Sequence, residues 1–206
     1  MSTVVINHDL PIAEELERRC PDLTVLDVNG HDEVMAALPA ADIFVCSPTY
    51  WDDEFLKKLD QISWIQTTSA GYDALPVDEL YNRGIVLTNA TSIHDPVVAE
   101  HVFALAFSFS RMIPKFVSNQ AGHRWGSRTE LSMDLTDWKD CTLTVYGLGS
   151  IGEEIAERAL AFEMDVYGIK RSPEDYNGCL PDERVYSNSR FFDLLQKTDL
   201  LVAIVP

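Results

Sequence analysis

A glycine-rich stretch, Gly147-Leu148-Gly149-Ser150-Ile151-Gly152, constrains the fold of this chain more than any other part of the sequence. It follows an apolar, β-branched run at 141–146, which is typical of a buried parallel strand. It leads into residues 150–160, whose apolar side chains recur with the period of an amphipathic helix. A G-x-G-x-x-G turn between a strand and a helix is the pattern of a dinucleotide-binding site, so we expect such a site here.

The three glycines of this turn have separate expected roles. Gly147 permits the tight turn, Gly149 lets the backbone approach a pyrophosphate, and Gly152 lets the helix pack closely on the strand. The unpaired N–H groups of the first helical turn are then expected to face the phosphates.

The residues after the next predicted strand indicate which dinucleotide is bound. That strand, at 165–169, is followed by Lys170-Arg171-Ser172. An NAD site typically carries an acid there, which holds the ribose 2′-hydroxyl and would repel a 2′-phosphate. Two cations and a hydroxyl would bind that phosphate, so we expect NADP(H), with NAD as the second choice. The alternative is that Lys170 and Arg171 only form a solvated turn.

Acidic residues outnumber basic ones along the whole chain. The 206 residues contain 33 Asp+Glu and 16 Lys+Arg, which gives a formal net charge of −17. Such a surface repels nucleic acid and anionic membranes, so neither is an expected partner. Because the carboxylates are not gathered in one tail, their excess leads to the hypothesis that the protein is adapted to high salt.

The cysteines and the N-terminus lead us to expect a cytoplasmic protein. Cys20, Cys46, Cys141 and Cys179 lie far apart and form no C-x-x-C pair. They are therefore expected to be reduced thiols and not a disulfide framework or a zinc site, and no metal is expected. The N-terminus has no basic segment followed by a long apolar run, so no signal peptide or membrane span is predicted.

Short apolar runs alternate with helical patterns over residues 1–94. Strands are expected at 3–6, 24–28, 42–46, 63–67 and 85–88, and helices at 11–20, 31–38, 52–59 and 77–82. This alternation is the mark of a parallel sheet covered by helices on both faces. We therefore expect residues 1–94 to form a complete, flavodoxin-like α/β domain.

A long apolar helix is expected to open the second domain, residues 95–206. It runs from Asp95 to Arg111 and is apolar on nearly every side, so it is either buried in the domain or covered by a second subunit. Pro114 is expected to kink or end it.

The remaining strands supply only part of a dinucleotide-binding domain. They are expected at 141–146, 165–169 and 199–205, with a short segment near 184–186 and a helix at 191–196. A complete Rossmann sheet is built from two mononucleotide-binding halves, and only the first half is expected here. The chain is therefore expected to be a fragment, incomplete at its C-terminus.

Several motifs together resemble the N-terminal two-thirds of the D-isomer-specific 2-hydroxyacid dehydrogenases. The resemblance runs from end to end of the chain. Its motifs are Thr68-Ser69-Ala70-Gly71-Tyr72-Asp73, Gly84-Ile85-Val86-Leu87-Thr88-Asn89, Val97-Val98-Ala99-Glu100-His101 with Arg111, Gly122-x-x-Trp125, the Gly147–Gly152 turn, and Val205-Pro206. The resemblance implies that residues 1–94 bind the substrate and that the helix after Asp95 forms a homodimer contact.

The resemblance also implies roles for individual residues. The backbone amides of Ala70 and Gly71 would hold the substrate carboxylate. Residues 148–151 would contact the pyrophosphate, Val98 the nicotinamide, and Val205-Pro206 the adenosine ribose region.

The catalytic set of the family falls outside this sequence. It consists of an Arg that binds and polarises the 2-keto acid, a His that passes the proton and a Glu that tunes the His, and all three come after Pro206. No catalytic residue is therefore assigned in this chain. Of its five histidines, only His94 is expected near the substrate cleft.

These observations favour an NADP(H)-preferring D-2-hydroxyacid dehydrogenase that works as a 2-keto acid reductase, with the 206 residues inactive alone. The alternative is a non-catalytic nucleotide-binding or dimerisation module of the same fold, from a truncated gene or of the redox-sensing corepressor type. Formate and phosphite dehydrogenases of the same superfamily are less favoured, because their additional residues are not recognised here. Tyr50, Trp51 and Tyr72 indicate a pocket for apolar substrate tails.

Overall fold

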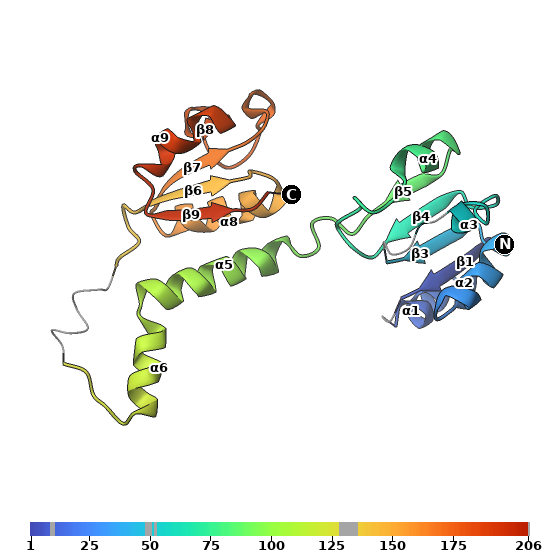
Figure 1. Cartoon of the computed structure of the whole chain (residues 1–206), viewed down its shortest axis with the longest axis horizontal. Coiled ribbons are helices and arrows are strands. Elements are labelled where there is room, and N and C mark those ends of the chain that lie inside the picture. The colour runs from blue at the N-terminus through green and yellow to red at the C-terminus, as the bar shows by residue number, and fades with distance from the viewer. Residues whose placement is uncertain (9–10, 48–50, 52, 128–135, 206) are drawn as a thin grey trace. The chain divides into compact units, whose positions relative to one another are not determined.

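The chain forms two compact units, Met1–Thr91 and Ser92–Pro206, each built on its own parallel sheet (Figure 1). The computed structural model describes residues 1–8, 11–47, 51, 53–127 and 136–205. Each unit has its own apolar core.

Unit 1 contains a five-stranded parallel sheet in the order β2-β1-β3-β4-β5. Its strands are β1 (Thr3–Asn7), β2 (Thr24–Asp27), β3 (Ile43–Cys46), β4 (Trp64–Thr67) and β5 (Val86–Thr88). This is the strand order of flavodoxin-like folds. The structure therefore confirms the expected fold class for the first part of the chain.

Helices cover both faces of this sheet. They are α1 (Ile12–Arg19), α2 (His31–Ala37), α3 (Asp53–Leu56) and α4 (Val77–Asn82), with a 3-10 turn at Leu38–Ala40. Helix α1 packs on Val4 and Ile6, whereas α2, α3 and α4 pack on the opposite face, around Val5 and Phe44. The two faces follow from the alternation of side chains along β1. Helix α3 is shorter than the helix expected at 52–59, and Asp52 lies outside the described residues.

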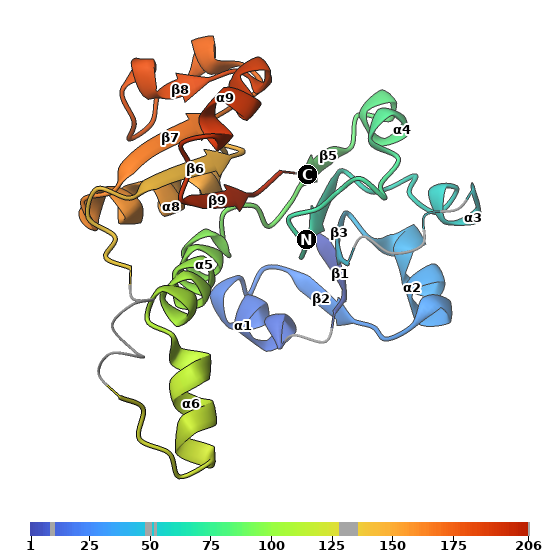
Figure 2. The same ribbon diagram turned by 60° about the vertical axis from the view of Figure 1, so that its left-hand side comes forward.

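Unit 2 contains a four-stranded parallel sheet in the order β8-β7-β6-β9 (Figure 2). Its strands are β6 (Thr142–Tyr146), β7 (Asp165–Ile169), β8 (Val185–Tyr186) and β9 (Leu200–Ala203). Numbered from β6, the order is 3-2-1-4, which is the first part of the Rossmann order. The expected half of a dinucleotide-binding sheet is thus confirmed as a fold.

The two faces of the second sheet carry different helices. Helices α5 (Asp95–Ser110) and α8 (Ser150–Ala161) pack together on one face, where the small side chains of Ala99, Ala156 and Ala159 are fully buried. Helix α9 (Phe191–Leu195) lies on the other face. The described residues of this unit also form three 3-10 turns, at Pro173–Asp175, Asp182–Arg184 and Asn188–Arg190.

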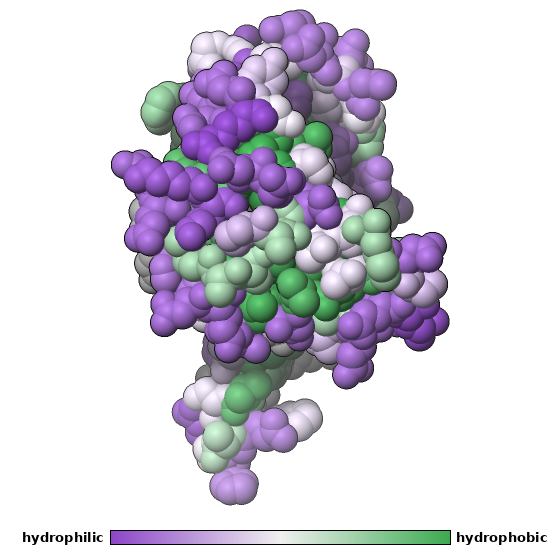
Figure 3. All heavy atoms as spheres, turned by 90° about the vertical axis from the view of Figure 1, so that its right-hand side faces the viewer, coloured by the Kyte–Doolittle hydropathy of each residue, from purple (hydrophilic) through white to green (hydrophobic). Residues whose placement is uncertain are grey.

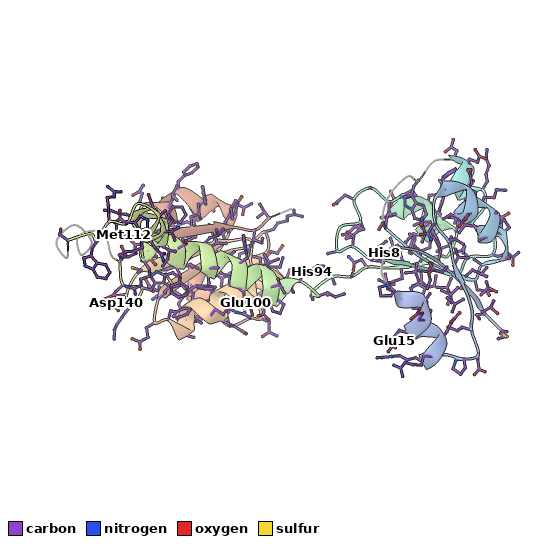
Figure 4. All side chains as sticks on the ribbon, turned by 90° about the horizontal axis from the view of Figure 1, so that it is seen from below. His8, Glu15, His94, Glu100, Met112 and Asp140 are labelled. Atoms are coloured by element: carbon purple, nitrogen blue, oxygen red, sulfur yellow. The ribbon has the colours of Figure 1, made fainter. Side chains whose placement is uncertain are left out.

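Helix α5 ends earlier than Pro114, and a second helix follows it. Met112 adopts a left-handed conformation with φ 54°, and α6 (Ile113–Ala121) starts directly after it (Figure 4). Pro114 lies in the first turn of α6, where a missing N–H costs nothing because that group has no partner inside the helix. The expected break is present, but Pro114 starts a helix instead of ending one.

Helices α5 and α6 expose many apolar side chains. The face of α5 that carries Ala99 and Phe103 is buried in the core of unit 2. No residue of α6 is buried. Figure 3 shows apolar side chains on α6, at the bottom of the view. No single helix among the described residues is long and apolar enough to cross a bilayer; α5 and α6 meet that criterion only as a pair bent by 63°.

Candidate functional site

The glycine-rich turn lies between the end of β6 and the start of α8, as the sequence predicts. Gly147 has φ +112°, and a Cβ atom there would lie 2.2 Å from the Ile204 carbonyl oxygen. A Cβ atom at Gly152 would lie 2.2 Å from the Gly147 carbonyl oxygen. Both positions therefore require glycine, the first for the turn and the second for the contact between α8 and β6.

Gly149 differs from the other two glycines because the space beside it is open. A Cβ atom at Gly149 would meet nothing within 4 Å. The packing of the chain itself would therefore allow a side chain at position 149. The lack of one leaves room for a ligand to approach the backbone. This open position fits the role expected for Gly149 beside a pyrophosphate.

Backbone donors are free at the start of α8. The first hydrogen bond of the helix runs from the Glu153 N–H to the Gly149 carbonyl, at 2.9 Å. In the described chain, the N–H groups of the four residues at 149–152 have no hydrogen-bond acceptor. Free N–H groups at the positive end of a helix form an anion site, and Ser150 and Ile151 lie within it.

The turn is fixed in place by neighbouring strands. The N–H groups of Gly147 and Leu148 both donate to the Ile169 carbonyl, at 2.9 and 3.1 Å. The Leu148 side chain is buried against Gly168, where a Cβ atom would lie 1.9 Å from a Leu148 methyl group. Leu148 therefore offers only its backbone to a ligand.

A pocket of about 530 Å³ opens beside this turn. It lies where β6, β7 and β9 end, which is where doubly wound sheets bind their ligands. Its lining residues are Tyr146, Gly147, Leu148, Gly149, Ile169, Lys170, Arg171, Ser172, Asn188, Ile204 and Val205. No Asp or Glu is among the described residues that line it, so the pocket itself has no acid to repel a 2′-phosphate.

The two cations after β7 have different surroundings. Lys170 is half-buried, and its Nζ donates to the Leu148 carbonyl of the glycine-rich turn at 2.9 Å. Arg171 is exposed and makes no ion pair or hydrogen bond with the described part of the chain. An ammonium has three N–H bonds, so Lys170 keeps two for other partners, whereas all the donors of Arg171 are free.

Other predicted cofactor residues lie outside the lining of this pocket. Ser150, Ile151 and Gly152 form the first turn of α8, and Val98 lies in the first turn of α5, the helix that packs on α8. Pro206 lies outside the described residues. Four further lining residues were missed by sequence reasoning, namely Tyr146, Ile169, Asn188 and Ile204. Three of them are apolar or aromatic residues at or next to strand ends, and a single Asn at the start of a 3-10 turn carries no motif.

The predicted substrate residues, Ala70 and Gly71, lie in unit 1, in the loop after β4. The Asn89 side chain donates to the Ala70 carbonyl at 2.7 Å, and the buried Thr67 hydroxyl donates to the Ser69 carbonyl at 2.9 Å. The Gly71 N–H donates to the Ser69 hydroxyl at 3.1 Å. Within the described residues, the Ala70 N–H has no acceptor. One of the two predicted donors is therefore free and the other is occupied by the chain's own serine.

The aromatic residues expected near the substrate fall into different surroundings. Tyr72 is half-exposed and lines an apolar pocket of about 570 Å³ beside α4 and β5. The Trp51 ring instead packs on Phe55, with ring centroids 4.7 Å apart, and belongs to the core. Tyr50 lies outside the described residues, and His94 is exposed just before α5 (Figure 4).

All four cysteines are free thiols. Burial raises the pKa of the Cys46 thiol to about 12, so Cys46 is neutral at ordinary pH. In the described ranges, no group of three or more His, Cys, Asp or Glu side chains is arranged to hold a metal ion.

A Gly-rich turn with free N–H donors and a pocket at the ends of parallel strands is characteristic of the dinucleotide-binding class of α/β folds. A family model described as D-isomer specific 2-hydroxyacid dehydrogenase, catalytic domain, matches residues 2–165. The chain belongs to this family.

The chain is also similar in sequence to individual proteins. The D-3-phosphoglycerate dehydrogenase of Bacillus subtilis (strain 168) is 29% identical over 168 residues, covering 80% of this chain and 30% of the relative. The glyoxylate/hydroxypyruvate reductase B of Pectobacterium atrosepticum is 29% identical over 202 residues, covering 95% of this chain and 61% of the relative.

A solved structure shares the fold over the whole chain. The crystal structure of a D-isomer specific 2-hydroxyacid dehydrogenase family protein from Aeromonas salmonicida subsp. salmonicida A449 matches with a TM-score of 0.82 and 28% identity. The match covers 100% of this chain and 64% of the other. This chain thus spans less than two-thirds of each of these three proteins.

Proposed function

We propose that the protein is an NADP(H)-preferring D-2-hydroxyacid dehydrogenase that works as a 2-keto acid reductase. Family membership supports the reaction class. The observation that carries the cofactor preference is the exposed, unpaired Arg171 at the rim of a pocket whose described lining contains no carboxylate.

The residues of unit 2 would hold the cofactor along the ends of its strands. The free N–H groups at 149–152 would bind the pyrophosphate, Val205 and Pro206 would contact the adenosine ribose region, and Val98 the nicotinamide. When bound, the nicotinamide supplies the hydride that reduces the keto carbon. In unit 1, the amides of Ala70 and Gly71 would hold the substrate carboxylate, and no proton donor is assigned within the 206 residues.

The 2′-phosphate of NADP(H) would be bound chiefly by Arg171 and Ser172. A planar guanidinium with free donors suits a phosphate oxygen pair, and the Ser172 hydroxyl adds a further donor. Lys170 would contribute charge, but its first contact is with the Leu148 carbonyl. One charge-assisted bond contributes about 1.5–3 kcal/mol, which corresponds to a preference of roughly 10- to 100-fold.

Calorimetry with NADP+ and NAD+ tests this cofactor assignment. The 206-residue chain is expected to bind NADP+ more tightly, and Arg171→Ala is expected to remove most of that preference while leaving NAD+ affinity within about threefold. Arg124→Ala is the matched control, because Arg124 is exposed in the same unit and, within the described residues, bonds only to Asn119. Equal affinity of the unmodified chain for the two dinucleotides would contradict the proposal.

A non-catalytic nucleotide-binding or dimerisation module is the second candidate. The exposed apolar side chains of α5 and α6 favour it, because they fit a contact surface between proteins. Oxidation of NADPH in the presence of small 2-keto acids, measured on the natural protein at its full length, separates the two. Turnover supports the reductase, whereas binding of NADPH without turnover of any 2-keto acid supports the module.

The exposed apolar side chains of α5 and α6 support a homodimer. They are Val97, Leu105, Phe109, Ile113, Phe116 and Val117. Apolar side chains that are exposed on neighbouring helices in this way are typical of a contact surface between proteins. Sedimentation of the chain should give a dimer mass that Phe109→Asp reduces to the monomer mass, and a monomer at all concentrations would contradict this interface.

We also propose a cytoplasmic, high-salt environment for the protein. The net charge of −17 and the free cysteines support it. Self-repulsion of the carboxylates should then destabilise the chain at low ionic strength. Thermal unfolding that does not change between low and molar salt would contradict the salt adaptation.

A further inference from the structure

We infer that Glu153 is a positioning residue for the dinucleotide site, because it fastens the loop that carries Arg171 and Ser172 to helix α8. This inference rests on the proposed function, since it concerns how the 2′-phosphate would be recognised. It adds a residue that does not line the pocket and that no motif assigns.

The Glu153 carboxylate binds the loop after β7 at two points. Its Oε2 atom accepts a hydrogen bond from the Tyr176 hydroxyl at 3.1 Å and another from the Cys179 N–H at 3.0 Å. The Tyr176 oxygen accepts a further bond from the Leu180 N–H at 2.9 Å. One carboxylate oxygen thus organises residues 176–180, and Leu180 is itself buried in the core of unit 2.

The loop approaches the Glu153 carboxylate most closely at Gly178. A Cβ atom at Gly178 would lie 2.3 Å from Glu153 Oε2 and 2.5 Å from Oε1. Oε1 is buried and has no hydrogen-bond partner in the described part of the chain. Burial, together with the neighbouring Glu153 carboxylate, raises the pKa of the Cys179 thiol to about 11. The Glu153 carboxylate and residues 176–180 are therefore closely packed against each other, unlike an exposed ion pair on the surface.

Glu153 connects this loop to the phosphate site. Its own N–H donates to the Gly149 carbonyl, so the residue belongs to the glycine-rich turn as well as to the helix. On the loop side, the Tyr176 N–H donates to the Pro173 carbonyl, which places a short 3-10 turn directly after Ser172. Only this turn lies between the Tyr176 contact and the residues at the pocket rim.

The position of the rim residues thus depends on Glu153. Lys170 is held separately, because its backbone N–H donates to Tyr186 and its side chain to Leu148. Within the described residues Arg171 has no such support, and the Ser172 carbonyl accepts only from the Asp175 N–H of the 3-10 turn, at 3.4 Å. Both are therefore fixed from the far side, through Tyr176. Without Glu153 they would sample more positions, and a 2′-phosphate would have to order them on binding. The pyrophosphate site would keep its geometry, because Gly147 and Leu148 are held by Ile169.

The inference predicts a selective loss of NADP+ affinity. In Glu153→Ala, the dissociation constant for NADP+ is expected to rise roughly tenfold, while that for NAD+ stays within about threefold. Glu153→Gln should restore NADP+ affinity to within about threefold, because its amide oxygen can accept both bonds of Oε2 and its amide nitrogen would take the place of the unpartnered Oε1.

Two further variants complete the design. Glu154→Ala is the matched control, because it removes the neighbouring carboxylate of α8, which pairs with Arg158 and does not touch the loop. Tyr176→Phe keeps the ring but removes the hydroxyl, and it replaces Glu153→Ala if that variant does not fold; its expected loss is roughly three- to fivefold for NADP+. Amide exchange at Cys179 and Leu180 reports the state of the loop in each variant.

The experiment is calorimetry with NADP+ and NAD+ on the 206-residue chain, combined with amide exchange. Faster exchange at Cys179 and Leu180 together with a selective NADP+ loss in Glu153→Ala, reversed in Glu153→Gln, supports the inference. A preference for NADP+ that survives in Glu153→Ala, or an equal loss for both dinucleotides, overturns the inference alone. An unmodified chain that shows no preference for NADP+ overturns the proposed function, and the inference with it.

Discussion

The two predicted binding loops of this protein are built in opposite ways. In unit 2, the glycine-rich turn is shaped by backbone contacts that exclude a Cβ atom at Gly147 and Gly152. In unit 1, the loop with Ala70 and Gly71 is held by side chains, namely Thr67, Ser69 and Asn89. The first loop leaves the N–H donors at 149–152 free in the described chain, while the second uses one of its two predicted donors internally.

This difference indicates how each loop would respond to a ligand. The turn in unit 2 is already arranged for an anion, so binding there needs little rearrangement. The loop in unit 1 must give up the bond between Gly71 and Ser69, or share it, before both amides can hold a carboxylate. The units also differ in charge: residues 1–91 have 16 acids and 5 bases, and residues 92–206 have 17 acids and 11 bases.

Alanine at the two loop glycines should have very different effects. Gly147→Ala combines a positive φ with a backbone clash and should lower the free energy of unfolding of unit 2 by about 3 kcal/mol or more. Gly71→Ala should change stability by no more than about 0.5 kcal/mol, since its new methyl group would meet only Ser69 Oγ, at 3.7 Å. Urea unfolding monitored by circular dichroism measures both.

Dinucleotide binding provides the control for this pair. Gly147→Ala should abolish it, and Gly71→Ala should leave it unchanged. If Gly147→Ala proved as stable as the parent chain and bound dinucleotide normally, the turn would be adaptable, and the contrast between the two loops would be wrong.

Lys170→Met tests whether the backbone turn needs its side-chain support. Because Lys170 Nζ is bonded to the Leu148 carbonyl, its loss should weaken NADP+ and NAD+ by a similar factor, roughly fivefold. Calorimetry with both dinucleotides measures this. A selective loss of NADP+ would instead show that Lys170 contacts the 2′-phosphate directly, as Arg171 is proposed to do.

Ser69→Ala should have the smallest effect and acts on the other loop. Removing the hydroxyl frees the Gly71 N–H, so oxalate, a small dicarboxylate, should bind about two- to threefold more tightly. The amide signals of Ala70 and Gly71 in an NMR titration report this binding. Weaker binding in Ser69→Ala would mean that the hydroxyl itself is a ligand of the carboxylate.

Most of the fold could be predicted from the sequence because strands and turns carry strong local signals. The runs at 142–146 and 165–169 are apolar and β-branched, and both are strands. The roles assigned to Gly147 in the turn and to Gly152 in packing agree with the spaces around them, while the role of Gly149 beside a pyrophosphate stays a prediction. These features depend on the conformations that each residue type allows its own backbone, so they can be predicted from short stretches of sequence.

The parts that could not be predicted depend on contacts between distant residues. Helix α6 was missed because Pro114 is compatible both with the end of one helix and with the first turn of another. The contact of Lys170 with Leu148 and the loop contact of Glu153 join residues more than 20 positions apart. No spacing in the sequence indicates such pairs.

Competition between two cofactor fragments tests the central claim most directly. Adenosine 2′,5′-bisphosphate carries the 2′-phosphate and adenosine 5′-monophosphate lacks it, so their affinities for the 206-residue chain isolate that group. We predict at least roughly tenfold tighter binding of the bisphosphate, with NMR shifts at the amides of Arg171 and Ser172, and loss of this difference in Arg171→Ala. Equal affinity for the two fragments would contradict the assignment of Arg171 and Ser172 as the NADP-selective site.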